Sequence, residues 1–314
     1  MSGSSGSESL LAPKNLSAFL LVSLIWGGTW LVIRDQISSV PPTWSICYRF
    51  VVASAGMFAL ARLRGEPFRL LPGAQKWVLA LAVFQFSLNF GFVYRAEGYV
   101  TSGLVAVIFA LLVVPNAVLG RIYLGQPIRR EFVIGSSIAA IGVAMLFAQE
   151  YRASPATLGE VLLGAVLCVG GILSASIANI LQATEGAKRQ PLLTLLAWSM
   201  LSGAVLNATV ALLVEGPPQF DPRPSYMLGV LYLGLAGSVV TFPLYYGLVR
   251  KVGAGTAAYS SVIVPIVAMI LSTLFEGFVW GPLPAAGAAI TLVGMLVAMR
   301  TRTAPPPRRA TPEP

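Results

Sequence analysis

The chain has 314 residues, of which 56% are hydrophobic and 11% charged, and its mean hydropathy is +0.78. Soluble domains carry about 25% charged residues, so this composition excludes an ordinary water-soluble fold and indicates a membrane protein. The net charge of +9 does not indicate nucleic-acid binding, because the basic residues follow a topological pattern.

Ten long apolar runs predict transmembrane helices. Residues 1–15 form a polar, Ser/Gly-rich tail without the pattern of a signal peptide, and the Pro/Arg-rich residues 303–314 predict a disordered tail. The predicted spans are 16–33, 43–61, 77–94, 100–120, 132–148, 158–182, 191–214, 226–249, 254–275 and 283–299. Each reaches the roughly 17–20 residues that cross about 30 Å of hydrocarbon, and continuous apolar runs exclude a β-barrel. The predicted fold class is an all-α polytopic membrane protein.

The ten spans divide into two copies of five, residues 16–148 and 158–299. Matching features recur at matching places: Gly27-Gly28 and Gly170-Gly171 in the first spans, Pro115 and Pro265 in the fourth, and Gly135 with Gly142 and Gly287 with Gly294 in the fifth. Because five is odd, the second copy must cross the membrane in the opposite sense. The sequence therefore predicts an inverted repeat, which is the architecture of many secondary transporters.

The basic residues predict the orientation. If the N-terminus lies inside the cell, sixteen of the 21 Lys and Arg residues fall in cytoplasmic segments, four fall on the opposite side, and Arg49 alone lies within a span. Positively charged segments stay in the cytoplasm. We therefore expect a multi-pass protein of the cell inner membrane with both termini cytoplasmic.

Missing residue types argue against an enzyme. The chain has no histidine and no phosphate-binding loop, and no carboxylate lies centrally in a span. The two cysteines, Cys47 and Cys168, lie isolated within spans, so no cofactor or metal site is expected. A proton relay would have to use Glu276 or Glu97, and we expect transport without tight proton coupling.

Several segments resemble a known family. The segment WGGTWLVIR at residues 26–34 is similar to the first-helix motif of the drug/metabolite transporter superfamily, in its EamA-type branch, and PP at 41–42 with YRF at 48–50 resembles that family's second-helix entrance. Pro115 with LGQ at 124–126 resembles a fourth-helix element that usually ends in Glu, and Pro265 with Glu276 resembles the same element in the second half. The resemblance covers residues 16–300, and within the family it is nearest to bacterial aromatic amino-acid exporters.

The resemblance implies ten helices around a central cavity lined by spans 1, 3, 4, 6, 8 and 9, which works by alternating access. Mid-span prolines kink helices, so Pro115 and Pro265 are candidate hinges, with static kinks as the alternative. The candidate substrate-binding residues are polar or aromatic side chains on these spans: Trp26, Trp30, Gln85, Asn89, Tyr99, Asn179, Tyr245, Tyr246, Tyr259 and Ser260. The alternative for the polar side chains is hydrogen bonding between helices. For Arg49 the alternatives are a contact to a substrate carboxylate and a structural contact.

The function expected from these features is export of small zwitterionic metabolites, amino acids including aromatic ones, by a monomer or homodimer. Its partners would be the small-molecule substrate and membrane lipid, with no nucleic acid. The alternatives are a carrier of other metabolites or cationic drugs, and a non-transporting membrane receptor. Loops of at most about a dozen residues disfavour a receptor, because they offer little surface for binding outside the membrane.

Overall fold

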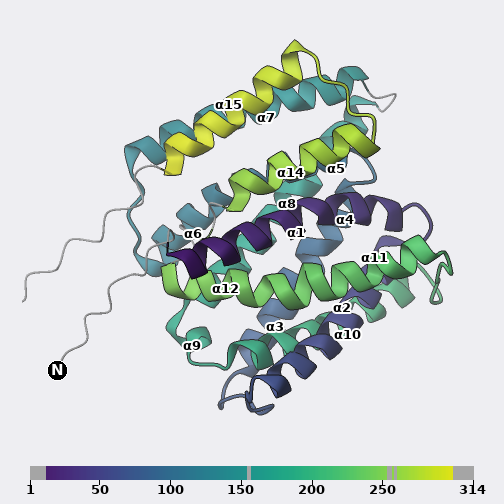
Figure 1. Cartoon of the computed structure of the whole chain (residues 1–314), viewed down its shortest axis with the longest axis vertical. Coiled ribbons are helices and arrows are strands. Elements are labelled where there is room, and N and C mark those ends of the chain that lie inside the picture. Colours follow the sequence, from purple (N-terminus) through teal and green to yellow (C-terminus); the bar gives the residue numbers. More distant parts are fainter. Residues whose placement is uncertain (1–11, 154–156, 253–256, 258–259, 300–314) are drawn as a thin grey trace, which may run out of the picture.

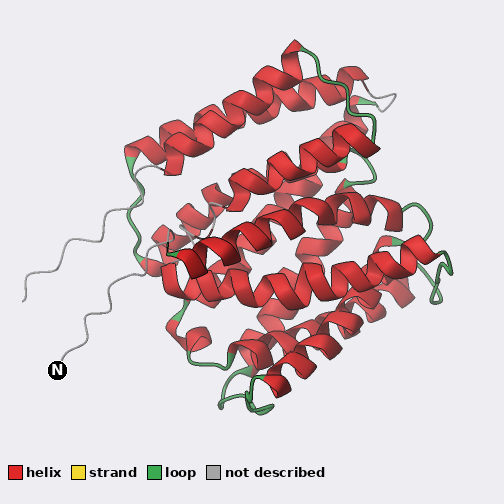
Figure 2. Cartoon of the chain, in the orientation of Figure 1, coloured by secondary structure: helices red, strands yellow, loops and turns green. Residues whose placement is uncertain are grey.

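The computed structural model describes residues 12–153, 157–252, 257 and 260–299. Every regular element in that part of the chain is helical, and Figure 2 shows no strand there. The first half contains α1 (Pro13–Gln36), α2 (Pro42–Leu63), α3 (Gln75–Val83), η1 (Phe84–Asn89), α4 (Phe90–Ala96), α5 (Ser102–Phe109), η2 (Ala110–Leu112), α6 (Val113–Leu124) and α7 (Arg130–Ala153). The second half contains α8 (Leu158–Ala183), α9 (Glu185–Lys188), α10 (Leu192–Val214), α11 (Pro224–Gly234), η3 (Leu235–Val240), α12 (Thr241–Val252), α14 (Ser260–Phe275) and α15 (Pro282–Met299).

The helices follow the apolar runs of the sequence closely. Within the described residues, seven helices are long and apolar enough to cross a membrane, and two shorter apolar helices cover Ile263–Phe275 and Pro282–Ala298. Helix α1 begins at Pro13, inside the predicted tail 1–15, because a proline readily occupies the first helical turn. The predicted disordered tail 303–314, the N-terminal residues 1–11 and part of the predicted span 254–275 lie outside the described residues. The chain is an all-helical, multi-span membrane protein.

Two glutamates outside the helices tie the halves together at α2 and α10, which pack along each other. The Glu66 carboxylate, just after α2, accepts hydrogen bonds from the backbone N–H groups of Leu193 (3.0 Å) and Thr194 (3.2 Å) at the start of α10. The Glu215 carboxylate, just after α10, accepts from the N–H of Thr43 (3.2 Å) at the start of α2. Each carboxylate satisfies N–H groups that a helix start leaves without partners and favours the positive end of the helix dipole.

Helices α7 and α15 form a closely packed pair at one side of the bundle (Figure 1). A Cβ atom built on Gly135 would lie 2.5 Å from the Gly294 carbonyl oxygen, and one built on Gly142 would lie 2.5 Å from the Gly287 carbonyl oxygen. The glycines that matched between the two halves of the sequence therefore meet each other across this interface. Small residues allow helix backbones to approach this closely in lipid, where hydrophobic association is weak.

A six-residue π-helical segment interrupts the third span of each half. Segment η1 joins α3 to α4, and η3 joins α11 to α12. A π turn leaves backbone carbonyls without their usual partner, and side chains from other helices bond these carbonyls here. The Asn207 side chain donates to Phe86 O (2.9 Å), while Arg49 and Trp26 both donate to Gly237 O (3.3 Å each). Such π segments often mark functional sites.

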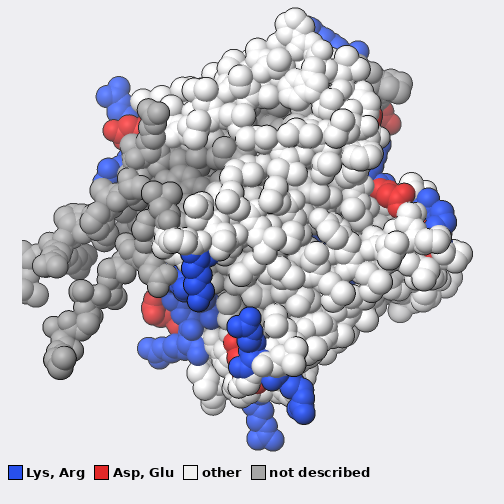
Figure 3. Space-filling model, in the orientation of Figure 1, with Lys and Arg blue, Asp and Glu red and all other residues white. Residues whose placement is uncertain are grey.

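Charged side chains gather at the two ends of the helices and leave a broad uncharged belt between them (Figure 3). Large apolar side chains are exposed within this belt, among them Leu24, Leu79, Val166 and Val205. An exposed apolar band of this kind fits lipid rather than water as the surrounding solvent.

Candidate functional site

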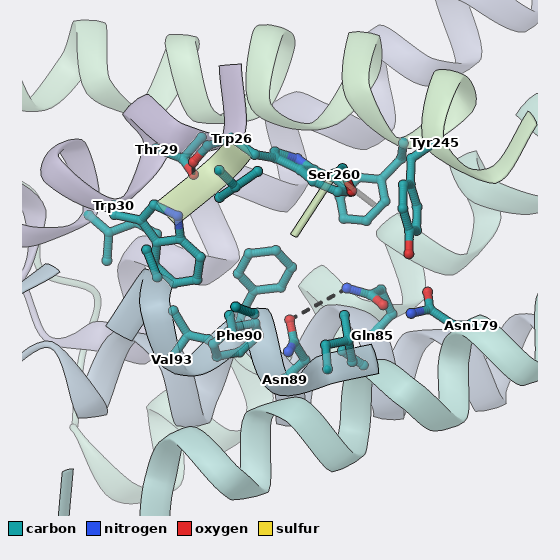
Figure 4. A pocket seen from close by; sticks show the side chains of 18 of the residues that line it. Trp26, Thr29, Trp30, Gln85, Asn89, Phe90, Val93, Asn179, Tyr245 and Ser260 are labelled. Atoms are coloured by element: carbon teal, nitrogen blue, oxygen red, sulfur yellow. Dashed lines mark hydrogen bonds between the residues drawn. The ribbon is translucent and has the colours of Figure 1, made fainter. Parts of the chain in front are cut away.

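A cavity of about 120 Å³ lies at the centre of the bundle. Helices α1, α4, α5, α8, α12 and α14 line it, together with η1, η2 and one residue of α2 (Figure 4). The lining residues are Trp26, Thr29, Trp30, Ile33, Arg49, Gln85, Asn89, Phe90, Val93, Ala106, Phe109, Ala110, Leu112, Ala175, Asn179, Phe242, Tyr245, Tyr246, Ser260, Val264 and Pro265. These helices come from both halves of the chain, so the cavity lies between the two halves.

Most of the candidate substrate-binding residues meet at this cavity. It is lined by Trp26, Trp30, Gln85, Asn89, Asn179, Tyr245, Tyr246 and Ser260. Tyr99 is not among the lining residues: it lies in the turn after α4, is 36% exposed, and packs its Cβ against Gly164 of α8. Its position beyond the end of the third span separates it from the cavity. Tyr259 lies outside the described residues.

Aromatic rings form much of the cavity wall. The ring of Trp26 lies 4.9 Å from that of Tyr245 and 5.7 Å from that of Phe242, measured between centroids. Trp30 lies 5.2 Å from Phe109. Because these edge-to-face and tilted arrangements leave ring faces available, the wall suits stacking against an aromatic or apolar solute and attraction of an ammonium group.

The amide side chains at the cavity are connected to one another. The Tyr246 hydroxyl donates to Gln85 Oε1 (3.0 Å), and Gln85 Nε2 donates to Asn89 Oδ1 (3.4 Å). Asn89 Nδ2 donates in turn to the Gly171 carbonyl of α8 (2.8 Å). Asn179 lies beside Gln85 and below the Tyr245 hydroxyl (Figure 4). Gln85 and Asn89 therefore link η1 to α12 and α8, as the alternative of hydrogen bonding between helices predicted.

Arg49 is almost completely buried, with 1% of its surface exposed. Its Nε donates to Ser238 Oγ (3.2 Å) and its Nη2 to Gly237 O (3.3 Å), both in η3. The guanidinium also lies 4.3 Å from the Phe90 ring centroid and close to the Tyr94 hydroxyl. Arg49 thus makes the structural contact that the sequence left open, and it also lines the cavity.

Two strong donors on residues that line the cavity have no acceptor in the part of the chain that the structure describes. Arg49 Nη1 and Trp30 Nε1 are buried and have no hydrogen-bond partner among the described residues. A buried donor left without an acceptor costs about 1–3 kcal/mol, and more for a charged group. No Asp or Glu is among the described lining residues. The side chains that line the cavity therefore include two donors without an acceptor among the described residues and one positive charge, which suits a solute that carries an acceptor such as a carboxylate.

The candidate hinge prolines occupy different local settings. Pro265 lies in the interior of α14 and lines the cavity. Pro115 lies in the first turn of α6, directly after the 3-10 segment η2, and is not a lining residue. A proline cannot donate to the carbonyl four residues earlier, which fits the tighter turn found at residues 110–112.

Several lining residues were missing from the sequence-based candidates. Phe90, Phe109 and Phe242 contribute ring faces, and Ala106, Ala110 and Ala175 contribute the space of the cavity. Phenylalanine and alanine are frequent in every membrane helix, so composition gives no signal for them. Their position on spans expected to line the cavity was the only available indication.

Comparison with known proteins identifies the family. The model of the EamA-like transporter family matches twice, over residues 14–148 and 162–300. The chain is 26% identical to the protein PagO of Salmonella typhimurium (83% of this chain and 84% of PagO) and 30% identical to the inner membrane transporter YedA of Escherichia coli strain K12 (83% and 82%). It is 23% identical to the "Probable amino-acid metabolite efflux pump" of Salmonella typhimurium (88% and 92%).

A solved crystal structure of another protein has the same fold. It is 18% identical in sequence and has a TM-score of 0.69, covering 90% of this chain and 95% of that one. The family match covers both halves of the helical bundle that encloses the cavity. The chain belongs to the EamA-like transporter family and is a membrane transporter.

Proposed function

We propose that this transporter exports small zwitterionic metabolites, aromatic amino acids among them, through the central cavity by alternating access. The observation that carries the proposal is the combination of an aromatic wall with two buried, unpartnered donors at one cavity. The donors suit a carboxylate, while the ring faces suit an apolar side chain and an ammonium group.

The architecture proposed is ten transmembrane helices in two inverted repeats, residues 16–148 and 158–299. Three features support it. The family model matches each half separately, and a π segment recurs in the third span of each half. Glu66 and Glu215 each cap the start of a helix that belongs to the other half. With both termini cytoplasmic, the α4–α5 turn and the end of α14 lie on the outer side of the membrane. We refer to this side as the outer end.

The size and charge of the cavity favour a small acid-bearing solute over a cationic drug. About 120 Å³ is small beside the ~300–1,000 Å³ of drug-sized pockets. A cationic drug would also need a counter-ion, and the described lining offers only the guanidinium of Arg49 as a charge. A buried cation beside an unpaired guanidinium is unfavourable because the two charges repel each other in a low dielectric.

Counterflow tests this proposal with purified protein in liposomes loaded with unlabelled phenylalanine. We expect external labelled phenylalanine to accumulate, and tyrosine and tryptophan to compete. Phenethylamine, which lacks the carboxylate, should compete at least tenfold less well. Accumulation equal to that of protein-free liposomes for every amino acid tested would refute the proposal, and phenylalanine binding without counterflow would favour a receptor.

A further inference from the structure

Glu97 is buried in the turn between α4 and α5, at the outer end of the bundle. None of its surface is exposed, although the neighbouring residues Gly98 and Tyr99 are exposed. Both carboxylate oxygens lack a hydrogen-bond partner among the described residues. An ionised carboxylate in such a place would lose its hydration and gain no hydrogen bond, so the neutral form is favoured.

The charged and titratable groups that interact electrostatically with Glu97 lie on α1, α4 and α8 and just after α14. Glu276, just after α14, is a second carboxylate within electrostatic range, and Arg34 at the exposed end of α1 provides the opposite charge. Tyr94 of α4 and the buried Cys168 of α8 complete the surroundings. Burial first and Glu276 second raise the pKa of Glu97 well above its ordinary value, while Arg34 has a smaller effect in the opposite direction.

The segment of α14 next to Glu276 supplies independent support. Ser272 lies one turn before Glu276, on the same helix face, and its hydroxyl is buried without a partner among the described residues. Ser102, the first residue of α5, donates a hydrogen bond to Glu276 Oε2. A Cβ atom on Gly103 would lie 2.8 Å from Met269 Sδ, so α5 and α14 are in close contact at this end. The two carboxyl groups therefore lie where α14 closes against α5.

We propose that Glu97 and Glu276 form a proton-binding site whose occupancy stabilises the closed outer end of the transporter. In the closed state Glu97 holds the proton, because its carboxyl group is buried without a hydrogen-bond partner among the described residues and lies within electrostatic range of Glu276. When α14 separates from the α4–α5 turn, Glu97 reaches water and releases the proton to the outer solution. Closing again requires uptake of a proton from that solution.

This inference goes beyond the expectation of transport without tight proton coupling and leaves it in place, because the proton is released to and taken up from the same outer solution. Proton binding follows from the geometry of the closed end alone. Its link to opening rests on the proposed alternating access. Neither of the two tests below uses a transported solute. A negative result in them can therefore be distinguished from a negative result in the counterflow experiment.

Infrared spectroscopy of the purified protein tests proton binding directly. We expect the carbonyl band of a protonated carboxyl group at neutral pH, its loss in Glu97→Gln, and a titration midpoint shifted to lower pH in Glu276→Gln. The control is Glu185→Gln, because the Glu185 side chain is 80% exposed on the cytoplasmic side; this variant should keep the band. Absence of the band in the wild type, or its persistence in Glu97→Gln, overturns the proposal.

Cysteine accessibility tests the link to opening. The variants are made in a protein from which both native cysteines, the buried Cys47 and Cys168, have been removed. One variant carries Val100→Cys, at a residue that is 2% exposed, and the other carries Tyr99→Cys, at an exposed residue. An impermeant maleimide labels both variants, and the measured quantity is the labelling rate of Val100→Cys divided by that of Tyr99→Cys. This ratio removes the pH dependence of the thiol reaction itself. We expect this ratio to rise severalfold from pH 5.5 to 8, and to stay low at both pH values in Glu97→Gln. A pH-independent ratio in the wild type overturns the link.

Discussion

Glu66 and Glu215 perform the same task for opposite halves of the molecule. Glu66 follows α2 and caps the start of α10, while Glu215 follows α10 and caps the start of α2. The exchange explains how two helices at the side of the bundle are held in register without a covalent link. It also places a carboxylate from each half at the start of a helix that belongs to the other half.

Replacing these carboxylates should destabilise the fold. Glu66→Ala leaves the N–H groups of Leu193 and Thr194 without acceptors, and we expect a loss of about 1–2 kcal/mol. Glu215→Ala should cost more, because Arg95 also loses its ion-pair partner at 3.1 Å. Thermal unfolding in detergent measures both effects, with Glu185→Ala as an exposed control. Equal stability of Glu66→Ala and the control would contradict the capping role.

The contact between α7 and α15 should be intolerant of larger side chains. A Cβ atom on Gly142 would collide with Thr291 Oγ1 and would lie 2.5 Å from the Gly287 carbonyl oxygen, so Gly142→Val must separate the two helices. We expect a loss of about 1–3 kcal/mol or failure to accumulate in the membrane. Ala140→Val, at an exposed position of the same helix, is the matched control and should behave as the wild type. If both variants are equally stable, the close approach of these helices is not required.

The prolines should affect turnover more than folding. Pro265→Ala restores a backbone hydrogen bond within α14 and favours a straighter helix, which biases the transporter toward one access state. A bias of about 1.4 kcal/mol changes the two populations tenfold, so we expect roughly tenfold slower counterflow with near-normal expression and binding. Pro115→Ala should act in the same direction. Unchanged counterflow in both variants would show that the prolines are static kinks.

Protein stability should fall as pH rises, through Glu97. In the unfolded chain this carboxyl has a pKa of about 4.3, whereas its pKa in the folded protein is raised by burial and by Glu276. Above ~4.3 the folded state therefore binds more protons than the unfolded state, so the stabilising effect of the neutral carboxyl is lost as pH approaches the folded pKa. Unfolding temperatures between pH 5 and 8 should decline more steeply in the wild type than in Glu97→Gln. Parallel pH profiles would show that Glu97 is ionised in the folded protein.

The sequence predicted the helices well because lipid leaves few alternatives for an apolar run of this length. The predicted span 158–182 corresponds to α8, and the predicted span 43–61 lies within α2. Most of the candidate cavity residues also meet, since polar and aromatic side chains inside a bundle must find partners.

The features that the sequence did not predict depend on contacts between distant segments. The π segments contain ordinary residues, and their freed carbonyls are stabilised by Asn207 and Arg49 from other helices. Glu97 lies outside the predicted spans, so the sequence suggests an exposed loop residue, whereas the structure buries it completely. Tyr99 was placed on a span expected to line the cavity, but it lies beyond the end of its helix.

The central claim is that solute passes through the cavity between the two halves, and filling the cavity tests it most directly. Ala175 of α8 lines the cavity, so Ala175→Phe should occupy much of its 120 Å³. Val166, on the same helix, is 67% exposed to the surrounding solvent, so Val166→Phe adds a ring of the same size outside the cavity. In counterflow of labelled phenylalanine, we predict that Ala175→Phe abolishes accumulation in a well-folded protein while Val166→Phe retains it. Wild-type accumulation in Ala175→Phe would contradict transport through this cavity.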